Sequence, residues 1–294
     1  MVSQVRRFNR IVTQRVGALD DRFLARDRPL GEARLLWEIG DSERDVRSLR
    51  VQLGLDSGYM SRLLRSLEAA GMITVVRNAS DQRVRMARLT ASGRAERAVL
   101  DRRSDDLAAS LLAPLSAAQR SRLVASMAEV ERLMTAGLVV MAAVDPADPR
   151  AQYCLRSYVD ELKTRFETGW DPSRSISAGV DELRPPAGLF VLATLHGNPI
   201  ACAALKFHPG APCELKRMWV STSARGLGIG RRLLAEMEQH GVDGGASVVR
   251  LETNGTLLEA IALYRSAGYA EVPAFNDEPY AHHWFEKHLT RSPE

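Results

Sequence analysis

The residues best suited to chemistry form a glycine-rich turn between a strand-like run and a helix. The run 214–220 is β-prone, the turn reads Arg-Gly-Leu-Gly-Ile-Gly over 225–230, and residues 231–238 carry apolar side chains at helical spacing. Glycines lack the Cβ that would hold a ligand away, so several backbone N–H groups can point at one anion. The helix adds unpaired N–H groups and the positive end of its dipole. This corner predicts a pyrophosphate site.

The turn lacks the fingerprints of the common nucleotide sites. A dinucleotide site needs G-x-G-x-x-G, and the phosphate loop of nucleotide triphosphatases needs a terminal Gly-Lys-Ser/Thr. Neither occurs at 225–231. A strand-to-helix turn without a ligand therefore stays open on this motif alone. A second motif, Ala-Ile-Ala-Leu-Tyr-Arg-Ser-Ala-Gly-Tyr at 260–269, follows the strand-like run 248–253.

Together the two motifs resemble those of the GNAT acetyltransferases. R-x-x-G-x-G behind the strand ELKRMWV is similar to the family's coenzyme A loop, and AIALYRSAGY is similar to its A-I-x-L-Y-x-x-x-G-F/Y segment. The resemblance covers roughly residues 138–288 and implies that acetyl-CoA is the co-substrate. The residues that it assigns to the coenzyme are Met218, Trp219, Val220, Arg225, Gly226, Leu227, Gly228, Ile229, Gly230, Arg231 and Asn254. Asn254 is included because Leu257 stands where the family often has an asparagine.

Acetyl transfer to an amine needs a deprotonated amine, a polarised thioester carbonyl and a proton for the leaving thiolate. The resemblance implies that Tyr264 is the acid, although its ring could instead only close a helix onto the sheet. It also places Glu214 where some members carry a catalytic glutamate, and we predict it as the base. A structural role for Glu214 stays open, with Glu252 as the alternative base.

Aromatic loop residues indicate where the acceptor would bind. Trp170, Phe275, Asn276 and Tyr280 lie in loops with which the family builds its acceptor pocket. Several aromatic residues and modest acidity favour a small amine over a basic protein tail. The three cysteines have no metal-ligand spacing and are expected to be reduced thiols, so no metal is predicted.

The charge distribution separates the two halves of the chain. Residues 1–136 contain 24 Arg, no Lys and 17 acidic residues, a net charge of +7. Residues 137–294 contain 16 Lys and Arg and 19 acidic residues, a net charge of −3. A basic first half indicates that this half alone meets a polyanion.

The first half contains a helix-turn-helix pattern followed by a basic hairpin. Short helices are predicted over 46–53 and 57–70, separated by Gly54, with β-prone runs at 72–77 and 84–90. The outward side chains mix short hydroxyls with arginines, as a recognition helix does, although a solvated amphipathic helix has the same pattern. The candidate DNA-binding residues are Ser57, Tyr59, Ser61, Arg62, Arg65, Arg77, Arg83 and Arg85.

Residues 30–94 resemble the winged helix-turn-helix of MarR-type repressors. The stretch LEAAGMITVVRNASDQRVRMARLTASGR carries the resemblance, with Asp81-x-Arg83 at the wing tip. The resemblance implies a homodimer on a double-stranded DNA operator. A helix from Phe8 to Phe23 and a long helical run from Gly93 to Met134 would form the dimer interface.

These features predict two domains: a mainly α winged helix-turn-helix over 1–136, then an α/β mixed-sheet GNAT acyltransferase fold over 137–294. Residues 138–144 are expected to form a buried strand. No apolar run approaches the roughly 20 residues of a membrane span, and no signal segment is recognised, so a cytoplasmic protein without a membrane partner is expected. The expected function is a DNA-binding regulator fused to an N-acetyltransferase. Alternatives are a domain that only senses acetyl-CoA or an amine, and a winged domain that dimerises without DNA.

Overall fold

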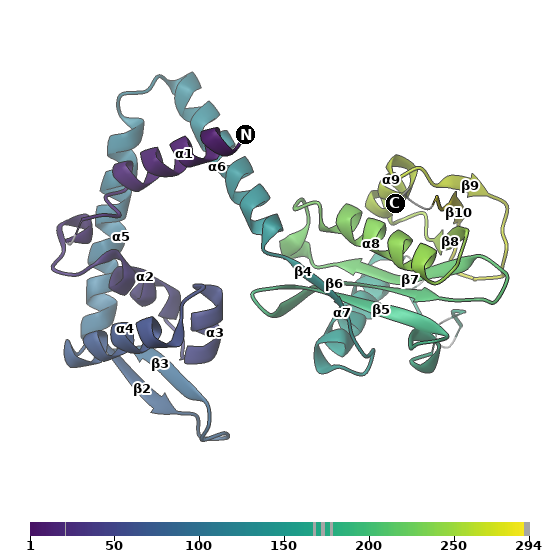
Figure 1. Ribbon diagram of the computed structural model, residues 1–294, viewed down its shortest axis with the longest axis horizontal. Coiled ribbons are helices and arrows are strands. Elements are labelled where there is room, and N and C mark those ends of the chain that lie inside the picture. The colour runs from purple at the N-terminus through teal and green to yellow at the C-terminus, as the bar shows by residue number, and fades with distance from the viewer. Residues whose placement is uncertain (21, 167–168, 172–173, 177–178, 291–294) are drawn as a thin grey trace. The chain divides into compact units, whose positions relative to one another are not determined.

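The computed structural model describes the chain except residues 21, 167–168, 172–173, 177–178 and 291–294. The chain forms two compact units, Met1–Ser126 and Met127–Glu294, and each is described by itself (Figure 1). The first has the predicted mainly α winged helix-turn-helix architecture, and the second is the predicted mixed α/β sheet. None of the described helices is long and apolar enough to cross a membrane.

The first unit packs short helices against a three-stranded sheet of order β1-β3-β2. Its core contains the buried side chains of Leu35, Leu36, Leu49, Leu64 and Leu67. The elements are α1 (Val2–Arg15), the 3-10 helix η1 (Phe23–Ala25), α2 (Leu30–Ile39), β1 (Arg44–Asp45), α3 (Val46–Gln52), α4 (Ser57–Ala69), β2 (Ile73–Arg77), β3 (Arg85–Leu89) and α5 (Ala91–Leu112), and α6 (Ala117–Gly137) continues into the second unit.

Side-chain caps set the starts of the helices around the predicted helix-turn-helix. The carboxylate of Asp45 accepts from the backbone N–H of Ser48 at 2.9 Å, and that of Asp56 accepts from Tyr59 at 2.8 Å. Each cap pairs an N–H group that the helix itself leaves unpaired. The helix-turn-helix and the hairpin therefore lie where the sequence predicted them.

Two helices predicted in the first unit differ from the structure. The helix expected from Phe8 to Phe23 ends at Arg15. Phe23 belongs to the separate 3-10 helix η1, and the Phe23 ring packs edge-on against Trp37. The run expected from Gly93 to Met134 is two helices, α5 and α6. Pro114 lies in the break, and proline cannot donate the backbone hydrogen bond of a continuous helix.

The second unit is a seven-stranded sheet of order β4-β5-β6-β7-β8-β10-β9. All neighbouring strands are antiparallel except β7 and β8, which are parallel. The elements are β4 (Val140–Ala143), α7 (Pro149–Arg165), the 3-10 helix η2 (Asp181–Leu183), β5 (Gly188–Leu195), β6 (Asn198–Lys206), β7 (Cys213–Val220), the 3-10 helix η3 (Thr222–Ala224), α8 (Ile229–Asp243), β8 (Val248–Thr253), α9 (Leu258–Ser266), β9 (Ala270–Val272) and β10 (His283–His288).

Helices cover both faces of this sheet, because alternate residues of its strands are buried on opposite sides. Phe190, Leu192 and Cys202 pack with Ala151 and Cys154 of α7. The intervening strand residues pack with α8 and α9 in the larger core cluster (Figure 1). The predicted buried strand at 138–144 is wrong in one respect: β4 pairs only with β5 at the sheet edge, and Val140 is 61% exposed.

The parallel strands β7 and β8 separate along their length. They pair at Cys213 with Val249 and at Glu214 with Arg250, and within the described residues their pairing ends there. Farther along, β7 bulges: Ala204 pairs with Lys216 and Cys202 with Trp219, so two residues of β7 oppose one of β6. Strands that separate in this way leave backbone groups and side chains free to face a ligand.

Candidate functional site

A cavity of about 540 Å³ lies beside the separated end of β7. We call it the loop cavity, because the glycine turn forms one of its walls. It contains most of the residues predicted for the coenzyme. Its walls are Tyr158, Glu161, Leu162, Arg165, Met218, Trp219, Val220, Ala224, Arg225, Gly226, Gly228, Ile229, Gly230, Arg231, Leu257, Glu259, Ala260, Leu263 and Tyr264. Two predicted coenzyme residues are not on these walls: Leu227, which packs against the core, and Asn254.

The backbone of the turn requires glycine at two positions. Gly226 has φ 81° and Gly228 has φ 74°, in the left-handed region that other residues rarely adopt. Gly228 is also the N-cap of α8, and no side chain caps that helix end. The first N–H groups of α8 are therefore available to an anion in the cavity, as the sequence predicted for a pyrophosphate.

Tyr264 of α9 lies on the wall of the same cavity and is 7% exposed. Its hydroxyl contacts the sulfur of Met218 at 3.9 Å. Burial raises the pKa of the Tyr264 phenol well above its ordinary value, so the group stays protonated near neutral pH and can donate. The ring also packs against Tyr269 and Phe285, at centroid distances of 5.8 and 5.9 Å. The geometry thus allows the acid role and the packing role together.

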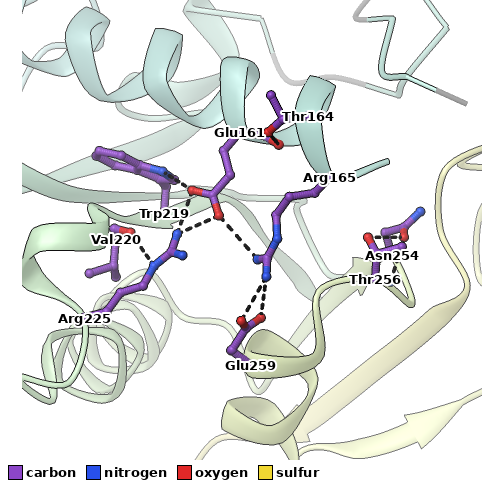
Figure 2. Close-up of polar contacts among 9 residues, drawn as sticks. All are labelled: Glu161, Thr164, Arg165, Trp219, Val220, Arg225, Asn254, Thr256 and Glu259. Atoms are coloured by element: carbon purple, nitrogen blue, oxygen red, sulfur yellow. Dashed lines mark hydrogen bonds and ion pairs between the residues drawn. The ribbon is translucent and has the colours of Figure 1, made fainter. Parts of the chain in front are cut away.

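A chain of ion pairs connects residues on the wall of the loop cavity, and Figure 2 shows these contacts. The Arg225 guanidinium binds both carboxylate oxygens of Glu161 at 2.6 Å, and Trp219 donates its indole N–H to Glu161 at 2.9 Å. Arg165 links Glu161, at 3.3 Å, to Glu259 of α9, at 2.9 Å. Arg225, which the sequence analysis assigned to the coenzyme, is therefore already paired with a carboxylate.

Sequence reasoning missed Glu161, Arg165 and Glu259. Glu161 and Arg165 stand four residues apart, a spacing that brings them together on one helix face. Nothing in the local sequence connects that pair with Arg225, which lies 64 residues after Glu161.

Glu214, the predicted base, lies on the paired part of β7 and is not on the wall of the loop cavity. Its carboxylate binds Arg250 at 2.6 Å and Lys216 at 3.1 Å, and it lies 3.3 Å from Nε2 of His208. Burial alone would raise the pKa of Glu214, but Lys216 and Arg250 outweigh it and hold that pKa below its usual value. This geometry favours a structural ion pair.

A second, smaller cavity of about 80 Å³ adjoins the first and shares Tyr158, Leu162 and Leu257 with it. We call it the aromatic cavity. It contains the alternative base Glu252 and two predicted acceptor residues, Trp170 and Tyr280. The complete wall is Tyr158, Leu162, Phe166, Trp170, Ser175, Ile176, Lys216, Arg217, Glu252, Thr253, Asn254, Leu257, Glu278, Tyr280 and Ala281.

The other predicted acceptor residues lie outside the aromatic cavity. The Phe275 ring lies under the Arg250 guanidinium at 4.4 Å, and the Asn276 side chain accepts from the Trp284 indole at 2.8 Å. Asn254, predicted for the coenzyme, is instead on the aromatic wall. Its amide donates to the Tyr280 carbonyl at 2.7 Å and its oxygen accepts from Thr256, so it shapes this loop.

In the first unit, the predicted DNA-binding residues gather on α4 and the hairpin. Ser57, Arg62, Arg65, Arg77, Arg83 and Arg85 are exposed, and Tyr59 and Ser61 are partly so. Arg77 and Arg85 are directly opposite each other in the β2–β3 register, and like charges in that position repel. Among the described residues, none of these five arginines forms an ion pair with a carboxylate, whereas Arg26, Arg28, Arg34, Arg88 and Arg97 each do.

Family comparisons agree with both units. The model of the acetyltransferase (GNAT) family matches residues 155–269, and the model of the MarR family matches residues 27–84. The second unit thus contains a GNAT acetyltransferase domain. The chain as a whole is a fusion of that domain with a MarR-type region, as the sequence motifs indicated.

Two curated relatives align with about a third of the chain. An uncharacterized N-acetyltransferase of Schizosaccharomyces pombe is 39% identical over 102 residues, which are 33% of this chain and 58% of that protein. The IAA acetyltransferase of Azospirillum brasilense is 38% identical over 99 residues, 33% of this chain and 63% of that protein. The chain thus spans about three-fifths of the length of these relatives.

Among solved structures, a GNAT-family acetyltransferase of Staphylococcus aureus is similar with a TM-score of 0.45 and 18% identity, over 52% of this chain and 99% of that one. An aminoglycoside 6′-N-acetyltransferase complexed with coenzyme A is similar with a TM-score of 0.40 and 19% identity, over 53% of this chain and 99% of that one.

Proposed function

We propose that the second unit transfers the acetyl group of acetyl-CoA to the amine of a small molecule. We also propose that the first unit binds a double-stranded DNA operator as a homodimer in the cytoplasm, with the domain boundary near Gly137. The observation that carries the enzymatic proposal is the loop cavity, where an uncapped helix N-terminus, the left-handed glycine turn and a buried tyrosine share one wall.

The residues of the loop cavity fit the coenzyme in two respects. Backbone N–H groups between Gly226 and Arg231 would hold its pyrophosphate, because the uncapped end of α8 favours negative charge. The stretch of β7 at Met218–Val220, beyond the residues that pair with β8, would offer N–H groups to the carbonyl oxygen of the thioester. When bound, acetyl-CoA supplies the activated acyl group.

Tyr264 would protonate the departing thiolate. Its phenol is neutral and buried, and within the described residues the Met218 sulfur is the hydrogen-bond partner of its hydroxyl. Sulfur is a weak acceptor, so the proton remains available to the thiolate. A general acid must hold its proton until charge develops on the leaving atom.

For the base we propose Glu252, the alternative in the sequence analysis, in place of Glu214. One carboxylate oxygen of Glu252 binds Lys216 at 2.5 Å, and the other is buried without a hydrogen-bond partner in the described residues. Because Glu252 is on the wall of the aromatic cavity, that free oxygen can take the amine proton directly or through a water.

The DNA-binding proposal is supported by the unpaired arginines of α4 and the hairpin. The dimer proposal is supported by α1, in which no residue is buried and whose apolar side chains Val5, Phe8 and Ile11 are 58%, 43% and 54% exposed. An apolar helix face without a partner is a common dimer interface.

The decisive experiment is calorimetric titration of acetyl-CoA into the wild-type protein and into two glycine variants. Gly228→Glu places a carboxylate and a side chain at the helix end that would hold the pyrophosphate. Gly245→Glu is the matched control, because Gly245 follows the other end of α8, has φ 83° and equally faces open space. We expect heat of binding in the wild type and the control and at least a hundredfold loss in Gly228→Glu. Absence of binding in the wild type would refute the enzymatic proposal.

A further inference from the structure

Arg217 occupies an unusual place in the aromatic cavity. It lies at the bulge of β7, with φ 56°, a left-handed conformation that residues other than glycine rarely adopt. An irregularity of this kind redirects a side chain relative to a regular strand. Its guanidinium lies 5.8 Å from the Tyr158 ring centroid and 5.9 Å from that of Trp170, and the residue is on the cavity wall.

Two other charged residues of this wall, Lys216 and Glu278, already have polar partners. Lys216 pairs with Glu252 at 2.5 Å and with Glu214 at 3.1 Å. Glu278 accepts from the backbone N–H of Ile176 at 2.6 Å, from the Ser175 hydroxyl at 3.0 Å and from the Tyr280 N–H at 3.3 Å.

Arg217, in contrast, has no carboxylate within ion-pair distance among the described residues, and its guanidinium lies beside the Tyr158 and Trp170 rings. A partly buried guanidinium has five N–H donors in a planar fork that matches a carboxylate. Leaving those donors without an acceptor is costly where water is partly excluded. The Arg217 guanidinium is therefore available to bind an anion that enters this cavity.

The aromatic residues strengthen the preference for an anion. The Arg217 guanidinium lies over the rings of Tyr158 and Trp170, so it already occupies a negative face of each ring. A cationic group placed directly beside these two rings would be repelled by the Arg217 guanidinium.

We propose that the acceptor is an amine that also carries a carboxylate, as a free amino acid does, and that Arg217 binds this carboxylate. This inference depends on the proposed acetyl transfer. The carboxylate stays unchanged in the reaction. Glu252 takes one proton from the ammonium group, the amine lone pair forms the new C–N bond to the acetyl carbon, and the C–S bond breaks. The leaving thiolate takes the proton of Tyr264. The second proton that the nitrogen loses passes through solvent and restores the Tyr264 phenol.

The test compares matched acceptors with the full-length protein. Free L-amino acids, their carboxamides and their decarboxylated amines are each supplied with acetyl-CoA, and thiol release gives kcat and KM. We expect kcat/KM for the free acids to exceed that of both series without a carboxylate at least tenfold. Amines without a carboxylate that react as well as the acids would overturn the inference and leave the acetyltransferase proposal intact. Acetyl-CoA binding without acetylation of any series would refute both.

Variants then assign the preference to Arg217. Arg217→Gln should raise KM for the acids about tenfold to hundredfold and change their kcat by less than about threefold. It should leave the kinetics of the amines without a carboxylate unaffected. Arg217→Lys should restore part of the affinity, since it keeps the charge without the fork. The control is Arg174→Gln, whose guanidinium lies over the Tyr280 ring at 5.9 Å but which is not on the cavity wall.

Both substitutions at Arg217 keep a non-glycine residue at the same φ, so neither adds backbone strain beyond that of the wild type. Undiminished acetyl-CoA binding by calorimetry confirms that each variant is folded. An acid preference that persists in a folded Arg217→Gln variant would exclude Arg217 as its source.

Discussion

The carboxylate of Glu161 on α7 binds the Arg225 guanidinium at the mouth of the glycine turn, with both oxygens 2.6 Å from one guanidinium nitrogen. This ion pair lies on the wall of the loop cavity, where we propose that a pyrophosphate binds. An acidic side chain there repels the ligand and holds the nearest arginine, so the free protein has to lose or rearrange this contact when the anion enters.

Replacing Glu161 with glutamine is therefore expected to tighten acetyl-CoA binding. Glutamine keeps an oxygen that can accept from the Trp219 indole, but it removes the negative charge. Because Arg225 is 39% exposed, the pair is partly screened, and we expect a two- to fivefold lower Kd, consistent with the roughly 0.2–1 kcal/mol of exposed ion pairs. Calorimetry measures the Kd. Glu236→Gln on α8, which is not on the cavity wall, is the control, and an unchanged or weaker Kd in Glu161→Gln would contradict the argument.

Tyr264→Phe tests the proposed acid without disturbing the core. The substitution keeps the ring that packs against Tyr269 and Phe285 and removes only the hydroxyl, which contacts the Met218 sulfur at 3.9 Å. We expect kcat for thiol release to fall by about a hundredfold, the lower end for a lost general acid, with an unchanged melting temperature. An unaltered kcat would remove Tyr264 from the mechanism.

The pH profile of the wild-type enzyme gives a second test of Tyr264. Burial raises the pKa of this phenol, so its protonated form persists above the ordinary value of about 10. Loss of activity from deprotonation of Tyr264 should therefore appear only on the alkaline side of that value. A descending limb below pH 10 that disappears in Tyr264→Phe would show that the phenol titrates earlier than its burial implies.

Two glutamates on neighbouring strands are expected to give opposite results when each is changed to glutamine. Glu252→Gln should lower kcat by about a hundredfold, because it removes the free carboxylate oxygen of the aromatic cavity. Glu214→Gln should leave kcat within about threefold of the wild-type value. It should lower the melting temperature, because Arg250 and Lys216 lose the buried carboxylate of Glu214.

The pH dependence of stability gives the sign of the Glu214 contribution. Its pKa is lower in the folded protein than in the unfolded chain, so the stabilisation is present above the unfolded pKa and is lost as pH falls through the folded pKa. The melting temperatures of the wild type and Glu214→Gln should therefore differ above the ordinary glutamate pKa of about 4.3. They should converge only as the pH falls below it, through the lower folded pKa. A large loss of kcat in Glu214→Gln, with stability unchanged, would restore the base role first expected for it.

Local motifs were enough to locate the glycine turn, Tyr264, α4 and the hairpin. Glycine at φ 81° and 74°, Asp56 as a cap and alternating β-prone residues each act over a few positions, so the sequence displays them directly. Pro114 also indicates the break between α5 and α6, but the prediction of one helix followed the apolar periodicity on both sides of it.

The contacts that decide the chemistry connect distant parts of the chain. Glu161 meets Arg225 across 64 residues, and Lys216 meets Glu252 across 36. Which glutamate faces a cavity depends on where β7 and β8 stop pairing, and the direction of Arg217 depends on a bulge in the register with β6. Neither register can be read from the composition of a single strand, because alternation fixes the faces of a strand and not its alignment.

The unpaired arginines of the first unit give the last prediction. Arg77 and Arg85 repel each other across the hairpin, so a polyanion that lies over the hairpin relieves an existing repulsion as well as forming new contacts. Arg83→Ala at the wing tip and Arg62→Ala on α4 should each weaken binding to a palindromic operator. Each should also reduce the slope of log K against log salt concentration by about 0.9, the value for one phosphate contact. Arg34→Ala is the control, because Arg34 is 60% exposed but pairs with Glu38 at 2.6 Å. Salt-dependent gel shifts or fluorescence anisotropy measure all four proteins. Equal slopes in the wild type and in both variants would mean that neither arginine contacts a phosphate, and the operator would then have to bind elsewhere on this unit.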